Sequence, residues 1–204
     1  MPEDQDDKIR IHQDRLIVKP HRPDLEEKLF FLLSGIIVSI PITLLFGTFT
    51  NNFLGILPLV FANIISVVVF TPFIEEFAKA YPLFYRHGET ERSIFILGFL
   101  VGLGFGITEF ILYVFVLHVP VFIRLPGIFF HAASTSIVAY GIAKKQPVKF
   151  YLVAVGLHFL NNFSALFDSG DIGILVANLG AFYLCWRFYS KTTENFIGGS
   201  YFAK

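Results

Sequence analysis

Residues 71–85 read TPFIEEFAKAYPLFY. Two adjacent carboxylates, Glu75 and Glu76, and one lysine, Lys79, follow an apolar run that begins near Leu54. Ionisable side chains are costly inside lipid, by about 2.5 to 3.5 kcal/mol each on insertion scales, and they usually mark a functional site there. This stretch therefore predicts a membrane-spanning segment with a polar site inside it.

The composition of the whole chain is that of a membrane protein. Of its 204 residues, 54% are hydrophobic and 16% are charged, with a mean hydropathy of +0.64. A soluble domain carries about 25% charged residues. The charges are also uneven, because 14 of the 32 lie in the first 28 residues. The zero net charge leaves no basic surplus for nucleic acid, and the single cysteine, Cys185, excludes an intramolecular disulfide and a multi-cysteine zinc site.

Six apolar runs are long enough to cross ~30 Å of hydrocarbon, which takes about 20 helical residues. They cover residues 29–49, 54–85, 93–118, 121–143, 147–167 and 171–190. The segments TFTNN, RHGETER, HVP, KKQP and DSGD divide them and are rich in residues that end helices. The second run is too long for one upright span, and Pro72 is where we expect it to kink. The fold class predicted is an all-α membrane protein, a bundle of six transmembrane helices in the lipid bilayer.

The distribution of Lys and Arg predicts the orientation of this bundle. Six of these residues precede the first run, and others follow the second, fourth and sixth runs, whereas the loops between hold only Arg124. We therefore expect a multi-pass protein of the plasma membrane with both termini in the cytoplasm. The domains predicted are a cytoplasmic tail over 1–28, a membrane domain over 29–190 and a second cytoplasmic tail over 191–204.

Ionisable residues fall inside four of the predicted spans. They are Glu75, Glu76, Lys79, Glu109, His131 and His158. Counted from the cytoplasmic end of each span at 1.5 Å per residue, the carboxylates and imidazoles of the four spans lie ~15 to 24 Å deep. Four helices thus bring titratable side chains to one layer, which predicts a shared, water-accessible cavity near the middle of the bilayer.

The local spacing of polar residues supports a shared cavity. Residues four apart lie on one helix face, and the pairs at this spacing are Glu75 with Lys79, His131 with Thr135, and His158 with Asn162. The first pair can form an ion pair, and in the other two the second residue can orient the histidine or bind the same substrate atom. Glycines at 98, 102, 104 and 106 leave the third span smooth enough for close approach of another helix or a substrate.

Absent motifs narrow the chemistry that this cavity could carry. The chain has no HExxH and no GxSxG, and Asp168 and Asp171 lie in a loop, so zinc proteases of the HExxH type, nucleophile-elbow hydrolases and a buried aspartyl dyad are excluded. A carboxylate, two imidazoles and an amide can activate water and stabilise an oxyanion without a cofactor. The same groups, as Glu75, His131 and His158, can instead hold Zn²⁺. Either arrangement, metal-free or zinc-bound, is able to hydrolyse a peptide bond.

Two other classes of protein are compatible with the same residues. Glu75 and Lys79 could form a neutralised pair in a non-catalytic scaffold, although one lysine cannot neutralise two adjacent carboxylates in a low dielectric. A chain of Glu and His at mid-membrane also suits a proton-coupled carrier. Such carriers often contain inverted repeats with interrupted helices, and the sequence offers only the Pro72 break.

Four motifs on successive spans resemble those of one protein family. EEFAK (75–79), FGITE (105–109), HAAST (131–135) and HFLNN (158–162) fit the patterns EExxK, FxxxE, HxxxT and HxxxN. In this order they resemble the PrsW family of intramembrane proteases, within the superfamily of CAAX-prenyl endoproteases and CPBP proteins. The resemblance covers about residues 55–165.

The resemblance implies a role for each matching residue. Glu75 would polarise the attacking water with His131 or Glu109 nearby, and His158 and Asn162 would form an oxyanion hole. Glu76 and Lys79 would shape and neutralise the site, with Thr135 and Asn161 in support. CAAX enzymes have Arg in place of Lys79 and His in place of Glu109, so the substrate implied is a membrane-anchored regulator such as an anti-sigma factor. We expect it to enter laterally or from the cytoplasmic side.

Overall fold

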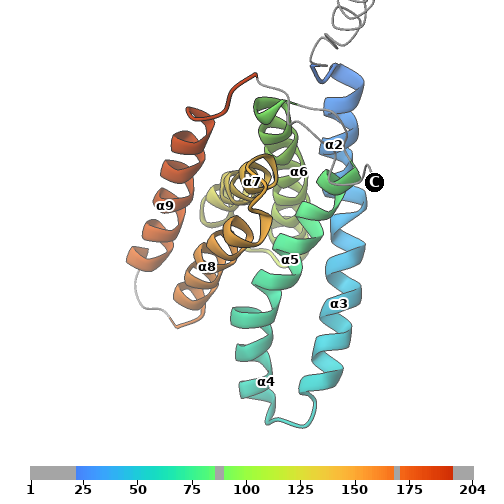
Figure 1. The fold of residues 1–204 in the computed structure, drawn as a ribbon. Helices are drawn as coiled ribbons and strands as arrows, with labels where there is room; N and C mark the ends of the chain where they lie inside the picture. The colour runs from blue at the N-terminus through green and yellow to red at the C-terminus, as the bar shows by residue number, and fades with distance from the viewer. Residues whose placement is uncertain (1–21, 86–89, 168–170, 195–204) are drawn as a thin grey trace, which may run out of the picture.

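The computed structural model describes residues 22–85, 90–167 and 171–194, and its regular elements there are all helices (Figure 1). The α-helices are α2 (Leu25–Ile37), α3 (Ser39–Leu54), α4 (Leu59–Ile65), α5 (Thr71–Ala80), α6 (Glu91–Ile111), α7 (Val121–Ala143), α8 (Pro147–Leu166) and α9 (Asp171–Tyr189). Short π-helical turns, η1 (Ser66–Phe70) and η3 (Leu112–Val116), and a 3₁₀ turn, η2 (Tyr81–Tyr85), extend them. Most of the predicted tails lies outside the described residues.

Five helical segments are long and apolar enough to cross a membrane. They are Leu25–Leu54, Leu59–Phe84, Glu91–Val116, Val121–Ala143 and Ile172–Tyr189. The 20-residue α8 has the length of a span, but it is not one of the five, and its polar residues Lys149, His158, Asn161 and Asn162 lower its apolar content. The multi-pass, all-helical architecture is confirmed, and the sixth crossing stays a prediction.

The predicted break between the first two spans, TFTNN, is wrong. Helix α3 continues through it to Leu54, and the turn lies at residues 55–58. The threonines are satisfied inside the helix, because the hydroxyls of Thr48 and Thr50 donate to the carbonyls of Leu44 and Phe46, both at 2.9 Å. At the other end, α2 begins at Leu25, where Asp24 and Glu27 form a capping box.

The second long span changes from π-helical to α-helical next to Pro72, and the predicted kink there stays a prediction. Pro72 lies in the first turn of α5, directly after the π-helical turn η1. Proline has no N–H to donate, and its ring collides with the carbonyl four residues earlier, that of Val68, so the α-helical ladder cannot run through it unchanged. The wider π turn accommodates this. The ten-residue α5 continues the span from η1 and carries Glu75, Glu76 and Lys79.

Glycines bring the central helices α6 and α7 into close contact. Gly98, Gly102 and Gly106 repeat every four residues on the face of α6 that packs on α7. A Cβ at Gly102 would lie 2.2 Å from the carbonyl oxygen of His131, which is too close for any side chain. On another face of α6, Gly104 approaches the backbone of α2 in the same way. This packing holds Glu109 of α6 beside His131 of α7.

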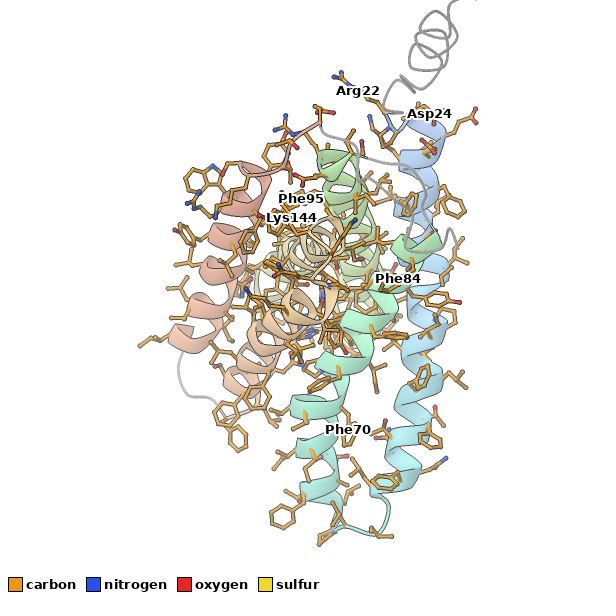
Figure 2. All side chains as sticks on the ribbon, in the orientation of Figure 1. Arg22, Asp24, Phe70, Phe84, Phe95 and Lys144 are labelled. Atoms are coloured by element: carbon orange, nitrogen blue, oxygen red, sulfur yellow. The ribbon has the colours of Figure 1, made fainter. Side chains whose placement is uncertain are left out.

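The outer surface and the two ends of the bundle fit a membrane setting. Large apolar side chains cover the outside of the helices (Figure 2). At one end, Glu194 lies 3.8 Å from both Arg22 and Arg92, and Lys144 pairs with Glu91 at 2.5 Å. The start of α2 and the residues after α9 therefore lie at the same end of the bundle.

Candidate active site

Six of the nine predicted site residues meet in one cavity of about 420 Å³ between α5, α6, α7 and α8. Its lining includes Glu75, Glu109, His131, His158, Asn161 and Asn162, together with Tyr113 and Arg124. These side chains come from four segments that are up to 87 residues apart in sequence, from Glu75 to Asn162. The prediction of a shared cavity is confirmed.

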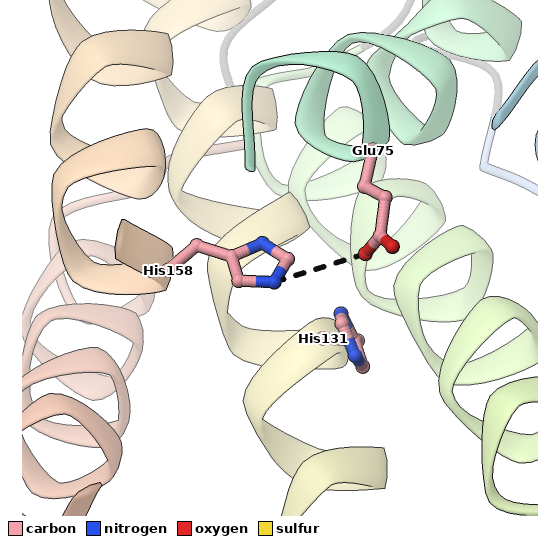
Figure 3. Close-up of side chains that lie close together, drawn as sticks. All are labelled: Glu75, His131 and His158. Atoms are coloured by element: carbon pink, nitrogen blue, oxygen red, sulfur yellow. Dashed lines mark ion pairs between the residues drawn. The ribbon is translucent and has the colours of Figure 1, made fainter. Parts of the chain in front are cut away.

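Glu75, His131 and His158 form the closest group of potential ligands in this cavity (Figure 3). One ligand atom from each lies within 4.8 Å of the others, and all three residues are buried. Glu75 Oε2 and His158 Nε2 are 3.7 Å apart, and the two imidazole rings meet edge to face with centroids 5.4 Å apart. Phe130 packs edge-on against both rings and helps to fix them.

Glu76 lies behind this group and is fully buried. Its Oε1 accepts hydrogen bonds from Lys79 Nζ at 2.6 Å, His158 Nδ1 at 2.9 Å and Ser134 Oγ at 3.1 Å. Lys79 therefore pairs with Glu76 and not with Glu75, which corrects the ion pair expected from spacing. Glu76 and Lys79 point toward α7, whereas Glu75 faces the cavity. Because a carboxylate can only accept here, the proton of His158 lies on Nδ1, and the lone pair of Nε2 faces Glu75.

A chain of hydrogen bonds and ion pairs connects Lys79, through His131 and Glu109, to Arg124. Lys79 Nζ donates to His131 Nδ1 at 2.9 Å, so His131 Nε2 carries the proton and donates to Glu109 Oε2 at 2.5 Å. Arg124 Nη2 pairs with Glu109 Oε1 at 2.9 Å. The Arg124 guanidinium also stacks over the Tyr113 ring at 3.6 Å from its centroid. His131 is thus held from both sides.

The supporting residues make more local contacts than the motifs suggest. The hydroxyl of Thr135 donates to the main-chain carbonyl of His131 at 2.9 Å, and this position lies against Gly102 of α6. Asn162 Nδ2 donates to the carbonyl of Val67 in the π turn at 3.0 Å. Asn161 Oδ1 accepts from Asn178 on α9 at 3.2 Å.

Sequence reasoning missed four residues of this site: Ser134, Arg124, Tyr113 and Asn178. Ser134 could have been found, since it lies three residues after His131 and shares its helix face. In the sequence Arg124 reads as a loop cation, and Tyr113, four residues after Glu109, is compatible with either the cavity or the outer interface. No sequence pattern pointed to Asn178, because its partner Asn161 lies on a different helix. Only the tertiary contacts reveal these roles.

The charges of the site are unbalanced. Glu75, Glu76 and Glu109 face two cations, Lys79 and Arg124, among the described residues. Glu75 Oε2 is buried and has no hydrogen-bond partner. Buried polar atoms without partners are costly. The site can therefore take up a cation, a proton or a polar substrate at Glu75.

A buried group of carboxylates and imidazoles that lines a cavity between long apolar helices is the arrangement expected of a membrane-embedded hydrolase. Comparison with family models identifies the family. Residues 26–188 match the PrsW family intramembrane metalloproteases, so the chain belongs to that family and is a membrane-embedded protease. No curated protein and no solved structure matched the chain.

Proposed function

We propose that this protein is an endopeptidase that hydrolyses a peptide bond of a membrane-anchored protein inside the cavity, with Glu75 as the group that activates water. The observation that carries the proposal is the gap between Glu75 and His158. The carboxylate oxygen has no partner, the imidazole nitrogen facing it has a free lone pair, and 3.7 Å is too long for a direct hydrogen bond. Both atoms can therefore act on a third group.

Catalysis would use the contacts already formed around this gap. Glu75 can accept the proton of a water molecule that lies against His158, while Glu76 holds His158 in the orientation that this requires. His131, which is fixed between Lys79 and Glu109, lies beside this gap (Figure 3). The buried partners keep each ring in place, so little reorganisation accompanies the reaction.

The same side chains fit a zinc ion. Two imidazoles and one carboxylate leave a fourth position open, as in catalytic zinc sites, and the unpartnered Glu75 oxygen and the surplus negative charge favour a cation. Glu75, His131 and His158 would hold it, with His131 exchanging one of its present contacts. In this alternative Glu75 would be a ligand of the ion, in place of its role as the base of the metal-free reaction. Zinc supplies a Lewis acid that polarises a carbonyl and makes bound water a stronger nucleophile.

The exposure of the site residues indicates the direction from which a substrate arrives. The exposed fraction of the side chain falls from 25% for Arg124 to 18% for Glu109, 10% for Glu75 and 0% for Lys79. Arg124 lies near the start of α7, at the end of the bundle away from the face that holds Glu194. We propose that the substrate enters from the Arg124 side. The sequence alone favours lateral entry or entry from the cytoplasmic side.

The test of this function is the substitution Glu75→Gln. Purified protein in lipid vesicles is incubated with a set of single-span membrane peptides, and cleavage products are identified by mass spectrometry. We expect Glu75→Gln to lower the rate of cleavage by about 10²- to 10⁴-fold, the usual contribution of a general base.

The matched control is Glu26→Gln, because Glu26 is an exposed carboxylate in the first turn of α2. It should cleave at the wild-type rate. Thermal unfolding confirms that both variants are folded. A folded Glu75→Gln variant with wild-type activity would remove Glu75 from the reaction and overturn the proposal.

A further inference from the structure

Two adjacent asparagines on α8, Asn161 and Asn162, line the cavity with His158. Their side-chain amides make different hydrogen bonds. Asn162 Nδ2 donates to the carbonyl of Val67 at 3.0 Å. That carbonyl belongs to the π turn before Pro72, so this amide group serves the backbone of the second span. The motif HxxxN points to Asn162, whereas the contacts draw attention to Asn161.

The orientation of the Asn161 amide is fixed by a residue on α9. Asn178 Nδ2 donates both to Asn161 Oδ1 at 3.2 Å and to the main-chain carbonyl of Ile174 at 2.9 Å. A carbonyl only accepts hydrogen bonds, so the Ile174 contact requires the nitrogen of Asn178 at this position. Asn161 must then turn its oxygen toward α9, which places its Nδ2 on the opposite side of the amide.

The arrangement has a structural cost that packing alone does not explain. Asn178 is 7% exposed, and its Oδ1 is buried without a partner. An apolar residue at 178 would avoid that unsatisfied oxygen. In contrast, no described residue accepts a hydrogen bond from Asn161 Nδ2. Both of its hydrogens are therefore free to bind a group in the cavity.

We propose that Asn161, held in place by Asn178, donates a hydrogen bond to the carbonyl oxygen of the scissile peptide bond. This inference rests on the proposed function. As the water oxygen bonds to the carbonyl carbon, the π electrons of the carbonyl move to its oxygen, and the water proton passes to Glu75. The Asn161 N–H stabilises the resulting negative charge and is itself unchanged. Asn161 is a catalytic residue in this scheme, and Asn178 is a positioning residue.

The test measures kcat and KM for Asn161→Asp, Asn178→Leu and the double variant in the vesicle assay. Asn161→Asp keeps an oxygen for Asn178 and loses the donor, so kcat should fall by about 10²- to 10³-fold, as for loss of one oxyanion donor. Asn178→Leu should lower kcat about tenfold, leave KM within about twofold, and leave the unfolding temperature unchanged or higher, because it removes the unsatisfied oxygen.

The double variant separates positioning from a general structural effect. If Asn178 acts through Asn161, then Asn178→Leu has no further effect on kcat once Asn161 is replaced by Asp. If the two substitutions lower kcat independently, so that their effects multiply in the double variant, the positioning role of Asn178 is overturned. Wild-type kcat in folded Asn161→Asp would overturn the role of Asn161. Glu75→Gln is measured in parallel. An inactive Glu75→Gln with an active Asn161→Asp refutes this inference alone, whereas an active Glu75→Gln refutes the proposed function.

Discussion

At the scale of single residues, the site depends on burying charges with partners. Glu76 Oε1 accepts three hydrogen bonds, from Lys79, Ser134 and His158. A buried ion pair of this kind contributes little net stability, yet removal of one partner is strongly destabilising because it leaves an uncompensated charge. The Oε2 atoms of Glu75 and Glu76 are both buried without a hydrogen-bond partner, but only Glu75 lines the cavity. That difference separates the residue available for chemistry from those that support it.

The first prediction at this scale concerns the metal. We expect the purified protein to bind about one zinc ion per chain, and His158→Ala to lose it, because two imidazoles and Glu75 form the ligand set. Atomic absorption measures the metal content, and chelation followed by zinc addition measures recovery of cleavage. His118→Ala, in an exposed residue between η3 and α7, is the control and should keep the wild-type zinc content.

Two results would contradict the zinc assignment. One is a metal-free protein that cleaves at the full rate. The other is a His158→Ala variant that retains its zinc. The first would leave Glu75 as the base of a metal-free reaction, which the Glu75→Gln variant tests separately. The second would show that the zinc ion is not held by His158.

At the scale of helices, the position of the site depends on how closely α6 and α7 approach. A Cβ at Gly102 would lie 2.2 Å from the His131 carbonyl oxygen and 2.8 Å from Ala132 Cα. Gly102→Ala must therefore push α7 away. Since the strained contact involves the backbone of His131 itself, the imidazole would move relative to Glu75.

We expect Gly102→Ala to destabilise the protein by about 1–3 kcal/mol, the usual cost of overpacking, and to reduce cleavage. Gly156→Ala on α8 is the matched control, because nothing lies within 4 Å of its Cβ position, and alanine favours the helix. Thermal unfolding and cleavage are measured for both. Equal behaviour of the two variants would show that the α6–α7 contact does not set the geometry.

At the scale of the whole molecule, the fold places both described ends on one face and the turn at residues 55–58 on the other. Glu194 lies near Arg22, whereas α3 and α4 carry the chain to the opposite end of the bundle (Figure 1). The distribution of Lys and Arg predicts that the first face is cytoplasmic.

Cysteine labelling checks this topology. In a Cys185→Ser background, Ile56→Cys, at a residue 88% exposed, should react with a membrane-impermeant maleimide on intact cells. Lys191→Cys, after α9, should react only after the cells are permeabilised. Labelling of both positions under the same condition would contradict an orientation with the ends inside and the substrate side outside.

Much of the fold was predictable from sequence because lipid imposes strong local rules. Apolar runs of about 20 residues must form helices that satisfy their own backbone, so the approximate positions of five spans followed. Helix ends were less predictable. TFTNN looked like a loop, but threonine hydroxyls can bond within a helix, and no local signal distinguishes the two outcomes. The sixth crossing remains a prediction, because the polar residues of the site lower the apolar content of α8.

The sequence by itself determined that carboxylates and imidazoles lie within the membrane, because charged groups in apolar runs are rare and their depth follows from helical rise. The tertiary structure alone decided which of them interact. Lys79 pairs with Glu76 and not with Glu75, Asn162 donates to the π turn, and Asn178 donates to the oxygen of Asn161. The physical reason is that spacing fixes the helix face on which a side chain lies, whereas its partner depends on the approach and rotation of a neighbouring helix.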